Sequence, residues 1–156
     1  MSSIKSFFLG VLAAFFALFF ELSLSLFFPE QKQALFFTRF SLFLIISALI
    51  EEIAKYALIY ASFSNIEKRM TIIFGGFLVG LGFAATEVFL NYYSKLNLIN
   101  IPFYFLLGMI FIHIFTSLFA ANVISKKQNK YFMATRVIVF NSTIHILYNL
   151  AVIFLF

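Results

Sequence analysis

The sequence predicts an all-α polytopic membrane protein, a bundle of about five transmembrane helices. Of its 156 residues 63% are hydrophobic and 11% are charged, and the mean hydropathy is +1.05. A soluble domain is nearer half apolar and a quarter charged, so this composition excludes a soluble enzyme, a disordered chain and an ordinary nucleic-acid-binding protein. A spanning helix needs about 20 apolar residues, which leaves room for about five spans.

Five apolar runs are expected to form these helices within a single integral membrane domain, residues 1–156. They cover about residues 4–28, 34–63, 71–93, 101–124 and 132–156. Lys5 gives the first run a signal-peptide-like start, but the run is too long for a signal peptide and no small-residue cleavage site ends it. We expect it to stay as a membrane anchor. Pro102 opens the fourth run, where proline suits a first helical turn.

Basic residues predict the orientation of the bundle, because cytoplasmic loops concentrate Lys and Arg. The net charge is +5, which we assign to the lipid bilayer rather than to nucleic acid. One side carries six basic residues, Lys5, Lys68, Arg69, Lys126, Lys127 and Lys130, and the other carries Lys32 and Lys95, with Arg39 close by. The N-terminus is therefore expected in the cytoplasm and the C-terminus outside it.

Small residues recur along one face of the third run. Gly76, Gly80 and Ala84 lie four residues apart, and small residues at this spacing let helices approach closely in lipid. We interpret this face as a helix-packing surface.

Ionisable residues inside the apolar runs are the strongest functional signal. Six of them are predicted at similar depth, Glu51, Glu52, Lys55, Glu87, His113 and His145. Each costs about 2.5–3.5 kcal/mol at bilayer depth, and a purely structural bundle has no need for six. We expect four helices to point them into one interior cavity.

The spacing within each run supports a shared site. Lys55 follows Glu51 by four residues and Glu52 by three, so either glutamate can pair with it. Three further sets each share a helix face: Phe83 with Glu87, His113 with Ser117, and Asn141 with His145 and Asn149. A carboxylate base beside groups that can donate a proton is what hydrolysis requires.

Several types of membrane hydrolase are excluded by the residues that the chain lacks. It has no H-E-x-x-H metal motif, no G-x-S-x-G turn, no aspartate and no cysteine. The absence of cysteine also excludes a disulfide framework and a thiolate metal site. A glutamate base with histidine and asparagine helpers remains.

This remaining set resembles the motifs of the PrsW-type glutamic intramembrane peptidases, relatives of the CAAX-prenyl endopeptidase and bacteriocin-processing (CPBP) membrane proteases. E-E-I-A-K at residues 51–55 resembles their E-E-x-x-K motif, and F-A-A-T-E at 83–87 resembles F-x-x-x-E. H-I-F-T-S at 113–117 resembles the third motif, and H-I-L-Y-N at 145–149 resembles H-x-x-x-D/N. The chain departs from the branch at Val88, where Asn is frequent, and at Asn149, where the branch has Asp.

The resemblance implies a metal-independent endopeptidase without a cofactor, which cuts a membrane protein or peptide. Glu51 would activate water, although spacing alone leaves Glu52 open for this role, and Glu87 would be a second water-binding carboxyl. The resemblance further implies that Glu52 holds Lys55 and orients the first motif, and that His145 and Asn149 donate to the oxyanion. His113 would share the role either of Glu87 or of His145, and Lys55, Phe83 and Ser117 would support the site.

The resemblance also implies a bacterial or archaeal cell membrane. Many relatives carry more helices, so a homo-oligomer stays open. Two other function classes remain as alternatives. A non-catalytic membrane scaffold or partner subunit predicts that changing Glu51 or His145 alters stability but no chemistry. A metal or proton transporter would use the same carboxylates and histidines to carry ions.

Overall fold

The computed structural model describes residues 3–27, 42–94, 103–126 and 130–155. Five helices make up almost all of this part: α1 (Ser3–Phe27), α2 (Leu42–Phe63), α3 (Arg69–Ser94), α4 (Phe103–Ser125) and α5 (Lys130–Leu155). The described residues contain no strand, and the predicted all-α class is confirmed. The expected start of the second run at residue 34 and the role of Pro102 lie outside the described residues.

Four of the five helices, α1, α3, α4 and α5, are long and apolar enough to cross a membrane. The remaining helix, α2, carries Glu51, Glu52 and Lys55 within its 22 residues. It packs against the other four helices, so its charged side chains have protein around them. A bundle that surrounds one charged helix with apolar ones keeps that charge away from lipid.

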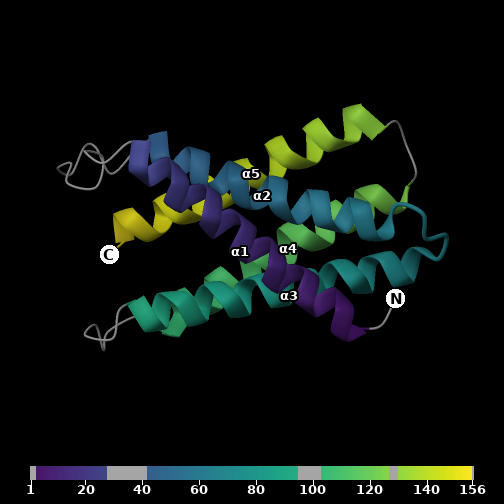
Figure 1. Ribbon diagram of the computed structural model, residues 1–156, viewed down its shortest axis with the longest axis horizontal. Coiled ribbons are helices and arrows are strands. Elements are labelled where there is room, and N and C mark those ends of the chain that lie inside the picture. Colours follow the sequence, from purple (N-terminus) through teal and green to yellow (C-terminus); the bar gives the residue numbers. More distant parts are fainter. Residues whose placement is uncertain (1–2, 28–41, 95–102, 127–129, 156) are drawn as a thin grey trace.

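The helices run roughly along the long axis of the molecule, and α1 crosses one face obliquely (Figure 1). Near its start α1 packs on α3, and towards its end it packs on α2. The N-terminus and the α2–α3 connection lie at one end of the bundle, and the C-terminus lies towards the other (Figure 1). The cavity described below lies in the half of the bundle where α1 and α3 finish.

Glycines allow α3 to pack backbone to backbone with two neighbours. A Cβ on Gly80 would lie 2.7 Å from the carbonyl oxygen of His113 and from the Cα of Ile114 on α4. On the other side, a Cβ on Gly82 would collide with the carbonyl oxygen of Phe7 on α1. The structure thus confirms the close packing expected from the small-residue face. This packing also fixes α3 next to His113.

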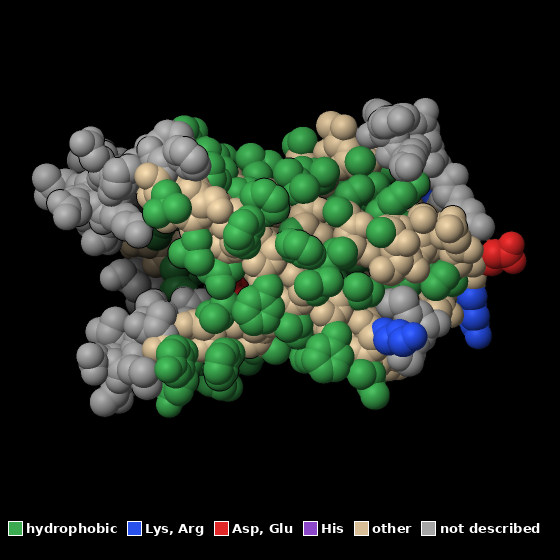
Figure 2. Space-filling model, in the orientation of Figure 1, with side chains coloured by type: hydrophobic (Ala, Val, Ile, Leu, Met, Phe, Trp, Pro, Cys, Tyr) green, Lys and Arg blue, Asp and Glu red, His purple; other side chains and the backbone are tan. Residues whose placement is uncertain are grey.

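The outer surface of the bundle is largely hydrophobic, as Figure 2 shows for one face. Large apolar side chains such as Phe8, Phe74 and Phe111 are more than half exposed. The visible charged side chains lie towards the end of the molecule that holds the N-terminus (Figure 2). An apolar belt with charge at its end is the surface that a bilayer solvates.

Candidate active site

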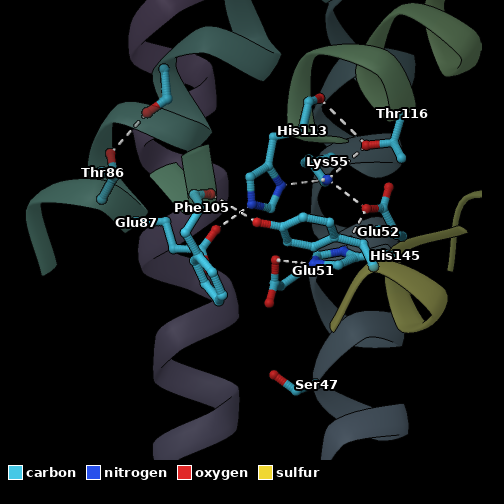
Figure 3. A network of polar contacts seen from close by, with 12 residues as sticks. Ser47, Glu51, Glu52, Lys55, Thr86, Glu87, Phe105, His113, Thr116 and His145 are labelled. Atoms are coloured by element: carbon cyan, nitrogen blue, oxygen red, sulfur yellow. Dashed lines mark hydrogen bonds and ion pairs between the residues drawn. The ribbon is translucent and has the colours of Figure 1, made fainter. Parts of the chain in front are cut away.

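Lys55 lies at the centre of a buried polar network contributed by α2, α4 and α5. Its Nζ donates to Glu52 Oε1 at 2.5 Å, to Thr116 Oγ1 at 2.9 Å and to His113 Nδ1 at 3.1 Å (Figure 3). Lys55 is 1% exposed, and its ammonium also lies 4.8 Å from the centre of the Phe83 ring. An ammonium has three N–H bonds, and these three acceptors use all of them. Lys55 is therefore held firmly in place.

The contacts of His113 define which of its nitrogens carries the proton. An ammonium can only donate, so Nδ1, which faces Lys55, must accept. The neutral ring then carries its proton on Nε2, which is in contact with Glu87 Oε2. The Phe83 ring packs on His113 with centroids 4.7 Å apart. His113 thus presents an N–H towards the Glu87 side of the site.

His145 has the opposite arrangement. Its Nδ1 lies 3.0 Å from Glu52 Oε1, the oxygen that also accepts from Lys55. A carboxylate paired with an ammonium accepts hydrogen bonds, so Nδ1 of His145 donates and the neutral ring has its free lone pair on Nε2. That nitrogen lies 3.8 Å from Glu51 Oε2. The ion pair between Glu52 and Lys55 therefore gives the two histidines opposite tautomers.

A cavity of about 490 Å³ opens beside this network, within the size range of about 300–1,000 Å³ typical of ligand pockets. Its wall includes Phe83, Glu51, Glu87 and Asn149. Leu18 and Tyr93 line it as well, which places the cavity in the half of the bundle where α1 and α3 finish (Figure 1). The cavity thus exposes one side of the polar network to a ligand.

The structure brings together nearly all of the residues singled out in the sequence. Glu51, Glu52, Lys55, Phe83, Glu87, His113 and His145 form the network, and Asn149 lines the cavity beside it. Ser117 is different, because its buried Oγ has no hydrogen-bond partner in the described part of the chain. Its neighbour Thr116 contacts Lys55 instead. Asn141 donates to the backbone oxygen of Thr116 at 2.9 Å and so joins α5 to α4.

Sequence reasoning missed Glu21 on α1. This glutamate lines the same cavity, and Ser47 on α2 donates to its Oε1 at 2.5 Å. The signal was present, since Glu21 lies well inside the first apolar run and a carboxyl at such a position is costly. No other ionisable residue lies near Glu21 in the sequence, so it belongs to no spaced motif.

One group of potential metal ligands exists among the described residues. Ligand atoms of Glu51, His113 and His145 lie within 4.8 Å of one another. Catalytic zinc sites use three protein ligands and an open position. Both nitrogens of His113, however, are engaged, Nδ1 by Lys55 and Nε2 by Glu87. The arrangement leaves Glu51 and His145 with free ligand atoms.

The fold and the site define a class: a polytopic helical membrane protein with a glutamate–histidine cluster at the wall of an internal cavity. The chain matches the family described as PrsW family intramembrane metalloprotease over residues 2–156, and it belongs to that family. Family membership supports an intramembrane protease that acts on membrane-associated polypeptides within a lipid bilayer. A search of curated proteins and a search of solved structures each found no match.

Proposed function

We propose that this intramembrane protease hydrolyses a peptide bond with water activated by Glu51. The observation that carries this proposal is the pair of atoms Glu51 Oε2 and His145 Nε2, which face each other at 3.8 Å beside the cavity. Both atoms are acceptors when Glu51 is ionised and His145 is neutral. One water molecule can donate to two acceptors at this separation, which would hold its oxygen ready for attack.

The proposed reaction moves one proton through Glu51. As the water oxygen forms a bond with the scissile carbonyl carbon, Glu51 takes a proton from it, and the carbonyl oxygen becomes an oxyanion. When the carbon–nitrogen bond breaks, Glu51 returns this proton to the leaving amine. A base that accepts and returns a proton in this way typically contributes about 10²–10⁴-fold in rate.

Asn149 is the proposed donor to the oxyanion, because it carries an amide on the cavity wall. The N–H on Nε2 of His113 is already in contact with Glu87, so His113 orients Glu87 instead. His145, which the family resemblance also suggested as a donor, has its lone pair on Nε2 when neutral. We therefore assign His145 to holding the water. Glu52 and Lys55 act as positioning residues, because they determine both tautomers.

We also propose that the reaction does not use a metal ion, although the family description contains the word metalloprotease. Metal binding to His113 Nε2 would need a lone pair where the contact with Lys55 places a proton. Two remaining ligands, Glu51 and His145, fall short of the three that catalytic zinc uses. The residues present therefore do not fit a catalytic metal centre.

The predicted orientation places the site towards the outer leaflet. The cavity lies in the half of the bundle away from the N-terminus, and the basic residues predict that the N-terminus is cytoplasmic. The cleaved peptide bond of the substrate would therefore lie close to the extracytoplasmic face of the cell membrane. The relation to the CPBP proteases and a homo-oligomeric state stay predictions.

The test compares peptide termini in membranes that contain wild type, Glu51→Gln or Glu67→Gln. Glu67 is an exposed residue between α2 and α3, so it controls for the loss of one carboxylate. Mass spectrometry should find new termini with wild type and Glu67→Gln that are missing with Glu51→Gln. Identical maps of peptide termini from the three folded proteins would contradict the proposal. They would favour the scaffold, or the transporter if purified protein also retained stoichiometric metal.

A further inference from the structure

Glu21 is a carboxyl on the cavity wall that the proposed reaction does not use. It comes from α1, whereas every residue in the proposed mechanism lies on α2 to α5. The side chain is half-buried, and Ser47 donates to one of its two oxygens at 2.5 Å. The hydrogen bond orients the carboxyl between α1 and α2 and leaves the second oxygen available as an acceptor.

The charge of the cavity wall is one-sided. Glu21, Glu51 and Glu87 line it, and none of the described lining residues is basic. The nearby cation, Lys55, is turned away into the network, where its three N–H bonds have acceptors. Glu51 Oε2 is buried and has no hydrogen-bond partner in the described part of the chain. The described wall therefore presents three carboxyls and no basic side chain to whatever occupies the cavity.

A group that carries a positive charge matches this wall. Complementary charge mainly gives specificity, and a carboxylate in a site of low dielectric strongly prefers a cationic partner over a neutral one. Lysine and arginine supply only donors, which fits the carboxyl oxygens of the wall. An anionic side chain would face three carboxyls and would be excluded.

The position of Glu21 sets which part of a substrate it can contact. Ser47, its partner, lies one turn before Glu51 on α2, about 6 Å along the helix axis. Figure 3 shows Ser47 on the same helix as Glu51 and displaced from it along the axis. An extended peptide advances about 3.3 Å per residue. A residue about two positions from the attacked bond would lie at the level of Glu21.

We propose that Glu21, oriented by Ser47, is a specificity-determining residue that binds the cationic side chain of a lysine or arginine in the substrate. This side chain lies within about three residues of the cleaved bond, on the side nearer the extracytoplasmic end of the bundle. The proposal rests on the proposed function, since it assumes that Glu51 marks the site of cleavage. Under this proposal, α1 contributes the residue that selects the substrate.

The experiment uses the full chain in proteoliposomes with a library of membrane-inserting peptides that vary around one cleaved bond. Lysine and arginine, their neutral isosteres, and glutamate are placed at each of three positions on both sides of the bond. Free and acetylated peptide N-termini are compared, which separates a side-chain cation from a terminal ammonium. The quantity measured is the ratio of kcat/KM for basic and neutral peptides.

We expect wild type to prefer the basic peptides at one position by about tenfold or more, the size of a hydrogen bond between charged groups. Glu21→Gln keeps the shape and can still accept from Ser47, and it should remove most of this ratio. Glu21→Lys should turn the preference towards glutamate. Ser47→Ala should reduce the ratio in part, because the carboxyl loses its orienting donor. Glu67→Gln should leave the ratio as in wild type.

The outcomes separate the two proposals. Cleavage that depends on Glu51 but shows the same ratio in wild type, Glu21→Gln and Glu21→Lys would overturn the role of Glu21 alone. A preference that follows the terminal ammonium rather than the side chain would overturn it too. Cleavage that is absent in wild type, or that persists in Glu51→Gln, would overturn the proposed function and this inference together. Monodisperse purification of each variant confirms that it is folded.

Discussion

Two regions of the polar network contrast in how their charges are satisfied. The inner region, Glu52, Lys55, His113 and Thr116, is at most 1% exposed, and hydrogen bonds connect all four residues. The cavity wall, Glu21, Glu51, Glu87 and Asn149, faces the cavity. There the side chain of Glu51 is 12% exposed and that of Glu87 is 30% exposed.

The contrast shows that the ionisable residues of this membrane protein serve two purposes, one structural and one in binding. A buried ion pair is costly to break because the remaining partner is left as an uncompensated charge. Groups in such a pair are suited to hold a geometry. Acceptors that face a cavity can still bind water or substrate. We therefore expect changes in the inner region to affect stability first, and changes on the cavity wall to affect activity first.

The largest effect is expected for Glu51→Gln on the cavity wall. Cleavage should fall by about 10²–10⁴-fold, because the base that takes the water proton is lost. The free energy of unfolding should change by less than about 1 kcal/mol, since the variant keeps the shape and Glu51 has no lysine partner among the described residues. Cleavage kinetics and denaturant titration in micelles measure the two quantities. A large loss of stability would place Glu51 with the inner region.

Lys55→Met should produce the reverse pattern in the inner region. It leaves Glu52 buried without its ammonium, which costs about 3–5 kcal/mol of folding free energy. The double variant Lys55→Met with Glu52→Leu removes both charges and should recover most of that stability, but not activity. Unfolding of the two variants in one detergent measures the difference. Equal stability of Lys55→Met and wild type would contradict the contrast between the regions.

Gly80→Ala tests whether the two regions depend on close helix packing. The new Cβ would meet backbone atoms of His113 and Ile114 at 2.7 Å, so α3 and α4 must separate, at a cost of about 1–3 kcal/mol. Gly75→Ala is the matched control, because its Cβ would meet the side-chain ring of Phe63 rather than backbone atoms. Thermal unfolding and cleavage are measured for both. Equal effects of the two variants would mean that backbone contact with α4 does not matter.

The smallest effect is expected from metal removal. Dialysis of purified protein against EDTA should leave the cleavage rate unchanged, because Lys55 and Glu87 engage both nitrogens of His113. Metal analysis before and after dialysis accompanies the assay. Loss of cleavage that zinc restores would refute the metal-independent mechanism and would show that the His113 contacts rearrange around an ion.

Much of the fold and most of the candidate site could be predicted from the sequence. Apolar runs of membrane length predict helices because backbone groups in lipid must be satisfied within the chain. The cost of burying charge identified Glu51, Glu52, Lys55 and Glu87 as belonging to one site. The same rule applied to Glu21, but this residue lies outside the spaced motifs. Ser117 shares a helix face with His113, yet no described hydrogen bond joins its hydroxyl to the network.

The sequence by itself therefore determined the fold class, the family and the residue types at the site, because periodicity and hydrophobicity act locally along each helix. Only the tertiary structure decided the contacts between helices. Glu52 holds Lys55, the pairing that the family resemblance implied and that helix spacing left open, and the structure showed that this pair orients two histidines from different helices in opposite ways. It also brought Glu21 to the cavity. Such contacts depend on how helices pack, and residues far apart in the sequence contain no local signal for them.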